Sequence, residues 1–251
     1  TRPADRIDRP LPAVMTEPRL CLEDGVTGAS AMIAAGVTTC NRAEGLADIR
    51  KADRELVIWR RALPLCLRNW LATLEASRLP DIRLLVQPSD LPQALEPHLD
   101  DSGMAPGEMR DLLLADVGDL VSTFASISRS ALVDMRLERV NHDACWKFHR
   151  DWVEARLLTT YRGLATEWVP PAHAEQALRE QRDFEGPLER LKLHDVAIFK
   201  GSCAAPGSGI VHRSPPIKGT GQTRLLLCLN TPSDASPTPW LAPLRHGPFR
   251  T

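Results

Sequence analysis

The chain has 251 residues, of which 43% are hydrophobic and 25% are charged, a composition typical of a folded protein with one large domain or one domain and an extension. Its 31 basic and 32 acidic residues are mixed along the sequence, so there is no basic stripe that would favour nucleic acid as a partner. No apolar run approaches the roughly 20 residues that span a bilayer. The six cysteines are scattered without a CxxC pair, which predicts reduced thiols and a cytoplasmic location.

The first half of the chain, residues 1–130, is expected to be mainly helical. Apolar residues recur there at helical spacing, with Pro, Gly and Asp at the breaks. In chain order the pattern predicts an extended proline-rich arm, two helices, a short strand, a third helix and a long helix: residues 1–20, 44–59, 67–74, 82–86, from 90, and 107–127.

The second half changes to a pattern of short strands, and the predicted β core covers residues 131–232. A polar insert at 172–192 is expected to be helical, and residues 233–251 form a proline-rich tail. Several short strands separated by turn residues favour a β-sandwich or barrel, so the fold class is α+β, with the helical half packed against the β core. The predicted strands are 132–140, 153–161, 166–169, 195–199, 209–213 and 224–230.

Three residues of the second half form a candidate metal site. His149 and Asp151 are two apart, so on an extended strand both side chains leave the same face. His212, on a later predicted strand, would complete two imidazoles and one carboxylate, the facial triad of non-haem Fe(II) oxygenases. The spacing alone is weak evidence, because His98 and Asp100 share it in what reads as a polar loop.

Arg224 follows His212 on the predicted antiparallel return strand. Arg224, Leu226 and Cys228 would share one face of that strand, and an inward arginine suits a carboxylate ligand because its guanidinium donates in a fixed fork. Two plainer interpretations remain open. His149 and Asp151 would form only a hydrogen-bonded pair, and Arg224 would form an ion pair with an acidic neighbour.

The order of these residues resembles the Fe(II)/2-oxoglutarate dioxygenase superfamily, whose core is a double-stranded β-helix, a jelly-roll or cupin-like barrel. The resemblance implies that His149, Asp151 and His212 hold iron and that Arg224 anchors 2-oxoglutarate. Less directly, it implies that Thr159, Tyr161 and Arg156 support the co-substrate, although a core role for Tyr161 is the alternative. Glu167 is either an extra ligand or a strand-end carboxylate.

More narrowly, several motifs resemble the bacterial domain-of-unknown-function family 1826, including Cys145 to Asp151, Arg156 to Tyr161 and Val211 to Pro216. That family has no established reaction, so it is the resemblance to the dioxygenase superfamily that implies an oxygenase acting on an unknown small molecule or peptide. The alternative function is a cupin-like protein that holds zinc or another divalent ion without turnover, in metal homeostasis. Cys145 with His142 and His149 would form a zinc-like cluster, but a buried thiol is favoured for Cys145.

Overall fold

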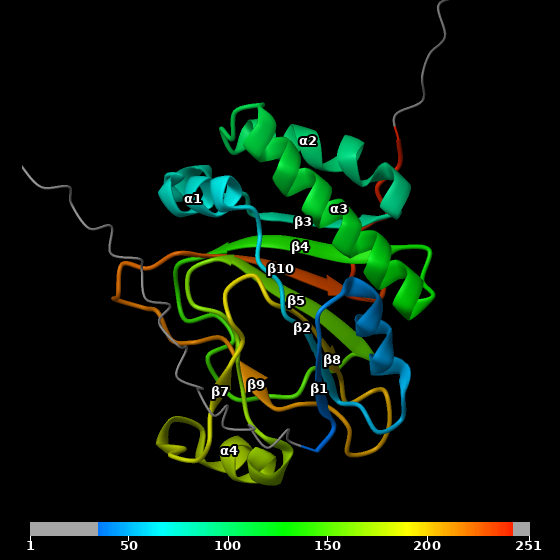
Figure 1. Ribbon diagram of the computed structural model, residues 1–251, viewed down its shortest axis with the longest axis vertical. Helices are drawn as coiled ribbons and strands as arrows, with labels where there is room; N and C mark the ends of the chain where they lie inside the picture. Colours follow the sequence, from blue (N-terminus) through cyan, green and yellow to red (C-terminus); the bar gives the residue numbers. More distant parts are fainter. Residues whose placement is uncertain (1–34, 243–251) are drawn as a thin grey trace, which may run out of the picture. The chain divides into compact units, whose positions relative to one another are not determined.

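The computed structural model describes residues 35–242, which form two β-sheets and four α-helices (Figure 1). The helices are α1 (Leu65–Thr73), α2 (Leu91–Asp101), α3 (Glu108–Ser128) and α4 (Ala174–Glu180). The strands are β1 (Val37–Cys40), β2 (Leu56–Trp59), β3 (Ile82–Val86), β4 (Val133–Val140), β5 (Ala155–Arg162), β6 (Glu167–Trp168), β7 (Glu189–Arg190), β8 (Val196–Lys200), β9 (His212–Arg213) and β10 (Arg224–Asn230). Short 3-10 helices lie at Ala43–Arg50, Ala76–Arg78, Pro88–Asp90, Pro171–His173 and Gln181–Asp183.

The larger sheet has seven strands in the order β1-β2-β8-β5-β10-β4-β3, and only the β1–β2 pair is parallel. Its centre is β10, which pairs with β4 on one side and β5 on the other. All seven residues of β10 are buried, as expected for a strand covered on both faces.

Alternate residues of this sheet face two different environments. One face packs against α1, α2 and α3 (Figure 1). The side chains of this face belong to the main hydrophobic core and include Met135, Leu157, Leu225 and Leu227. The other face carries Leu158, Leu226 and Cys228, which belong to a second cluster. Strand periodicity therefore decides which side chains meet the helices and which meet the opposite side of the sheet.

The smaller sheet has three short strands in the order β7-β6-β9. Phe148, Val169, Ala174, Ala177 and Val211 form a third apolar cluster, in which α4 packs beside this sheet (Figure 1). The insert expected at 172–192 to be helical therefore holds α4, a 3-10 turn and the strand β7.

The α+β class is confirmed, but the described residues show two sheets and no closed barrel. The region expected to be mainly helical contributes β1, β2 and β3 to the same sheet as the later strands, and the main core includes residues from both halves. The helix expected over 44–59 is wrong. A 3-10 helix ends at Arg50, and Leu56–Trp59 is a strand. Its side chains alternate, because Val57 and Trp59 pack on the face of the sheet that meets the helices, whereas Leu56 and Ile58 pack on the opposite face. The arm expected at 1–20 and the tail beyond residue 242 lie outside the described residues.

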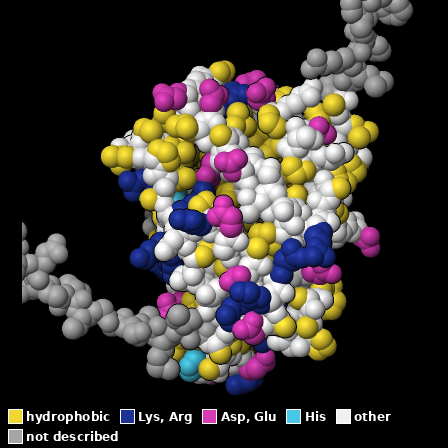
Figure 2. Space-filling view, turned by 45° about the vertical axis from the view of Figure 1, so that its right-hand side comes forward, with side chains coloured by type: hydrophobic (Ala, Val, Ile, Leu, Met, Phe, Trp, Pro, Cys, Tyr) yellow, Lys and Arg dark blue, Asp and Glu magenta, His cyan; other side chains and the backbone are white. Residues whose placement is uncertain are grey.

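The surface carries both signs of charge. Figure 2 shows lysine and arginine side chains interspersed with aspartate and glutamate on the face that it displays. Among residues 35–242, no helix combines the length and the apolar character needed to cross a membrane.

Candidate metal centre

Two backbone hydrogen bonds join His149 directly to His212. The amide of His149 donates to the carbonyl of His212 at 3.1 Å, and the amide of His212 donates to the carbonyl of His149 at 3.0 Å. Directly opposite residues of an antiparallel pair place their side chains on the same face. The two imidazole rings accordingly lie 4.6 Å apart between centroids.

Asp151 lies between the two imidazoles and completes the triad. Its Oδ1 lies 3.5 Å from Nε2 of His149, and its Oδ2 lies 3.3 Å from Nε2 of His212. One ligand atom of each residue can be chosen so that all three lie within 4.8 Å of one another. Within residues 35–242, this is the one group of His, Cys, Asp and Glu side chains close enough to share a metal ion.

The hydrogen bonds of both histidines suit metal binding. Nδ1 of His149 lies 2.8 Å from the carbonyl of Lys147, and Nδ1 of His212 lies 3.0 Å from the carbonyl of Ile210. A carbonyl only accepts, so each Nδ1 carries the proton and each Nε2 keeps its lone pair. A backbone acceptor behind a histidine ligand fixes its tautomer and ring orientation.

Asp151 is held as a carboxylate although it is buried. Burial alone would raise its pKa, but the adjacent imidazoles of His149 and His212 and the guanidinium of Arg156 outweigh burial and hold the pKa well below its ordinary value. Oδ2 is buried and accepts no hydrogen bond. An ionised, buried oxygen without a donor beside two free nitrogen lone pairs is the donor set that a divalent cation binds.

Two supports fix the Asp151 carboxylate and backbone. The guanidinium of Arg156 donates from Nη1 to Oδ1 of Asp151 and from Nε to Asn230 at 2.8 Å. The carbonyl of Asp151 accepts the amide of Ser202 at 2.8 Å and its hydroxyl at 3.0 Å. The neighbouring residue is Gly201, where a Cβ would lie 2.0 Å from the carbonyl oxygen of Val153 and 2.8 Å from that of Asp151.

Gln181 supports the other side of the site. Its side-chain carbonyl accepts the amide of Phe148 at 2.9 Å, and its amide group donates to the carbonyl of Phe148 at 3.0 Å. This pair of bonds imitates a backbone bridge and holds the residue before His149. No sequence signal marks Gln181 for this role, because its partner is set by the position of α4.

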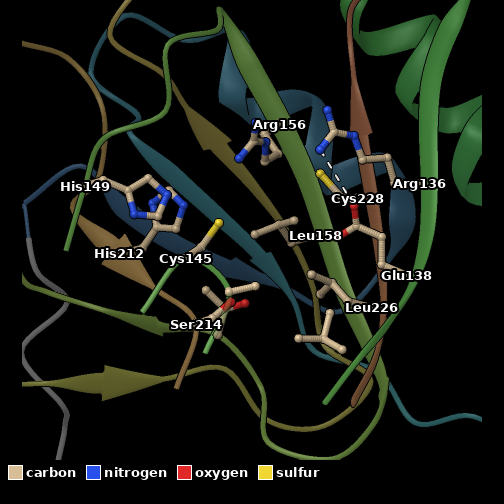
Figure 3. Close-up of a pocket in the computed structure, with 13 residues that line it drawn as sticks. Arg136, Glu138, Cys145, His149, Arg156, Leu158, His212, Ser214, Leu226 and Cys228 are labelled. Atoms are coloured by element: carbon tan, nitrogen blue, oxygen red, sulfur yellow. Dashed lines mark ion pairs between the residues drawn. The ribbon is translucent and has the colours of Figure 1, made fainter. Parts of the chain in front are cut away.

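A cavity of about 80 Å³ opens beside the two histidines. Figure 3 shows His149 and His212 on one side of it and the ion pair of Arg136 with Glu138 on the other. Apolar side chains, among them Leu158 and Leu226, line the space between them.

Arg224 is on the cavity side of β10, as predicted, since Leu226 and Cys228 of the same face line the cavity. Its side chain is wholly buried and lies behind the cavity wall. Nε donates to the carbonyl of Leu164 at 2.6 Å, and Nη1 donates to the hydroxyl of Ser214 at 2.8 Å. Nη2 is buried and has no partner, and no carboxylate of the described residues forms an ion pair with this guanidinium. Burial lowers the pKa of Arg224 to about 10, because Cys145, Glu167 and Glu138 only partly offset it.

Thr159 and Tyr161 do not reach the candidate site, contrary to the prediction. Both lie on the helix-facing side of β5, where Leu157 and Tyr161 belong to the main core. The Tyr161 hydroxyl donates to Asp116 of α3 at 2.6 Å, and burial together with that carboxylate raises the pKa of Tyr161 well above its ordinary value. Arg156 is on the opposite face and does reach the site, through Asp151 rather than through a co-substrate.

The structure also distinguishes between the alternatives for Glu167 and for Cys145. Glu167 pairs with Arg190 and Arg213, so it is a strand-end carboxylate in ion pairs. Cys145 is exposed and lines the cavity, contrary to the expected buried thiol, and its backbone has a φ of +52°. The cavity residues that the sequence analysis missed include Arg136, Glu138, Ser214 and Thr166, and the buried hydroxyl of Thr166 has no partner.

Comparison with known proteins gives one family match. The family model described as "Protein of unknown function (DUF1826)" matches residues 41–230. No curated protein matches the chain.

Solved structures with weak similarity to this chain include the following two. AviO1 from Streptomyces viridochromogenes Tue57 has 14% identity and a TM-score of 0.36, with 78% of this chain and 96% of that chain covered. The non-heme alpha ketoglutarate dependent carbocyclase SnoK from nogalamycin biosynthesis has 10% identity and a TM-score of 0.31, with 74% and 81% covered. Similarity at this level carries no argument about the function of this chain.

We expect Gly201→Ala to damage both stability and metal binding. The added methyl group would force residues 151–153 to move, at a cost of about 1–3 kcal/mol in the free energy of unfolding. Gly118→Ala in α3 is the matched control, because nothing lies within 4 Å of its Cβ, and it should stabilise by about 0.5–1 kcal/mol. Thermal melts and metal titrations measure both effects. A Gly201→Ala protein that behaves like the parent would contradict the proposed close contact.

We expect His149→Ala and His212→Ala each to weaken Zn(II) or Co(II) binding by more than about 100-fold, because each removes a ligand nitrogen. His98→Ala is the matched control, since His98 precedes Asp100 with the same spacing but is exposed in the last turn of α2. Metal titration of the purified variants measures the affinity. Retention of stoichiometric metal by either triad variant would remove the site assignment.

Metal affinity should rise with pH. Burial lowers the pKa of His149, but the nearby Asp151 carboxylate and the Lys147 carbonyl favour the protonated ring, outweigh burial and raise the pKa. In the metal-free protein, the stabilising contact of His149 with Asp151 is therefore present at low pH and is lost as pH rises through the raised pKa. A metal competes with that same proton, so Co(II) should bind more weakly at about pH 6 than at about pH 8, with proton release. Affinity independent of pH in isotherms across this window would argue against His149 as a ligand.

Proposed function

This chain belongs to the family described as protein of unknown function (DUF1826), and we propose that it is a non-haem Fe(II) oxygenase that uses 2-oxoglutarate as its co-substrate. His149, Asp151 and His212 would hold the metal and leave positions open on it. Iron bound there, together with 2-oxoglutarate and oxygen, would supply the oxidising power to hydroxylate or otherwise oxidise an organic substrate.

The observation that carries this proposal is the uncompensated charge of Arg224. A wholly buried guanidinium without a carboxylate partner is costly, and its unpaired Nη2 adds the cost of a missing hydrogen bond. A dicarboxylate that chelates the metal with one end would bring its other carboxylate to this charge. A storage site for a divalent cation gives Arg224 no task.

The neighbouring hydroxyl groups suit the same carboxylate. Ser214 accepts from Arg224 and lines the cavity, and the buried Thr166 hydroxyl lines it without a partner. Arg224 itself lies behind this wall, so the far carboxylate would reach Ser214 and Thr166 first and take Nη2 as a charged donor. Charged donors make the stronger hydrogen bonds to a carboxylate.

Other residues of the chain would position the reacting groups. The carbonyls of Lys147 and Ile210 orient the two imidazoles, and Arg156 holds the Asp151 carboxylate. In this proposal the two sheets are the opposing walls of a double-stranded β-helix, with the metal between their edges. The primary substrate is a small molecule or peptide rather than a nucleic acid, and the protein acts in the cytoplasm. The alternative is metal binding without turnover, and the experiment below separates the two.

We expect the Fe(II)-loaded protein to give a weak visible charge-transfer band when 2-oxoglutarate is added without oxygen. In Arg224→Met the affinity for 2-oxoglutarate should fall by about 10- to 100-fold, because a charged hydrogen bond to the co-substrate is lost. The same variant should keep its metal, and the melting temperature of the ligand-free protein should change little, because removing an unpaired buried charge offsets the lost bonds to Leu164 and Ser214.

Tyr161→Phe is the control variant, since its hydroxyl bonds to Asp116 on the other side of the sheet. It should bind metal and 2-oxoglutarate like the parent, with a loss of about 1 kcal/mol in stability. Full iron occupancy with no band, or a band that persists unchanged in Arg224→Met, would leave the metal-binding alternative standing.

A further inference from the structure

We propose that the end of the cavity opposite the two histidines binds the head group of a small zwitterion, an α-amino acid with an aliphatic side chain. The site is formed by Arg136 and Glu138 of β4. The role of this molecule as an oxygenase substrate rests on the proposed function. Its binding as a ligand can be measured without turnover.

Arg136 and Glu138 form a loose pair. They are two apart on β4, so both side chains leave the same face, and Nη1 of Arg136 lies 3.7 Å from Oε1 of Glu138. Their side chains are 33% and 34% exposed. The Nε of Arg136 is buried and has no partner. The pair therefore keeps unused donors and acceptors. Figure 3 shows both residues lining the cavity.

A second arginine of the same surface shows what a complete ion pair looks like in this sheet. Arg83 of β3 lies opposite Arg136 in the strand register and donates to Asp134 through two nitrogens, at 3.1 and 2.7 Å. Asp134 also accepts from Ser236 at 2.8 Å. Arg136 lacks the second nitrogen contact and Glu138 lacks a further donor, so we assign the ligand to Arg136 and Glu138 rather than to Arg83.

The two charges together select a zwitterion. A simple anion bound to Arg136 would lie next to the Glu138 carboxylate, and a simple cation bound to Glu138 would lie next to the Arg136 guanidinium, so each would be repelled. A molecule with a carboxylate and an ammonium on one carbon can place each beside the opposite charge. The cavity then gains no net charge, and the spare donors of Arg136 are used.

The walls of the cavity define the rest of the ligand. Leu226 lies opposite Glu138 in the register, Cys228 lies opposite Arg136, and Leu158 lies beyond Cys228 on β5. These side chains separate the charged pair from the histidines (Figure 3). An amino acid held at its head group would therefore direct an aliphatic side chain along this apolar surface toward the metal.

The test is calorimetry on the full chain loaded with Zn(II), which cannot support oxidation. The probes are L-alanine, L-valine, L-norvaline and L-leucine. We expect at least one to bind with a Kd of about 1 mM or tighter, and its amide and its N-acetyl derivative, which lack one charge each, to bind at least about tenfold more weakly. The comparison of these analogues uses the parent protein and does not depend on any variant folding.

Variants locate the site. Arg136→Gln and Glu138→Gln should each weaken the best probe by about tenfold or more, without loss of the metal. Arg139→Gln is the matched control on the same strand, because the Arg139 side chain donates instead to the carbonyls of Ala76 and Ser77, and it should leave the affinity unchanged. Melting temperatures confirm that each variant is folded.

Three results would overturn the proposal: no probe binding below about 10 mM, equal binding of the amide or the N-acetyl derivative, or unchanged binding by both Arg136→Gln and Glu138→Gln. Equal binding of the N-acetyl derivative would indicate a simple anion. Because Zn(II) protein is used, a positive result stands even if no 2-oxoglutarate band forms. A band without binding of any probe would retain the oxygenase and remove this substrate class.

Discussion

The candidate metal centre depends on the two backbone hydrogen bonds between His149 and His212. They join a segment that precedes β5 to the short strand β9, which in turn pairs with β6. A register shift by one residue would send one imidazole to the other face, so the bridge decides whether the two rings can share a ligand. Contacts that hold either segment, such as those of Gln181 with Phe148 and of Gly201 with the Asp151 loop, therefore act on the metal site from outside it.

Asp151 and Arg224 are both buried and charged, but only the charge of Asp151 is compensated by its neighbours. The carboxylate of Asp151 is surrounded by His149, His212 and Arg156, so it is ionised and oriented before any metal binds. The guanidinium of Arg224 is equally buried, but its contacts are neutral and one nitrogen has none. A compensated charge holds a structure together, whereas an uncompensated one favours a ligand of opposite sign, because the ligand relieves the cost of burial. In the proposed function, these different surroundings correspond to different roles, with Asp151 as a metal ligand and Arg224 as the anchor of the co-substrate.

The two faces of the seven-stranded sheet have different surroundings: one packs against the helices, and the other lines the cavity. Side chains facing α1, α2 and α3 form the main core and include the pair of Tyr161 with Asp116. Side chains of the other face include Arg136, Glu138, Leu158 and Arg156, which line the cavity. The helices thus cover the face of the sheet opposite to the one that lines the cavity. Polar residues of one strand can therefore have unrelated roles, as Tyr161 and Arg156 of β5 do.

The sequence by itself determined the α+β class, the positions of α1, α3, β3, β4 and β10, and the identity of the triad. These follow from local periodicity and from residue chemistry, which the order of residues carries directly. Strand alternation also placed Arg224 on the face of Leu226 and Cys228. Only the tertiary structure decided that the early strands join the late ones in a single sheet, because strand pairing depends on contacts between distant segments. It also decided that Thr159 and Tyr161 face the helices, since which of the two faces of β5 meets the cavity is set by what packs on each side. For the same reason the supports from Gln181 and Gly201, and the missing partner of Arg224, are visible only in the folded chain.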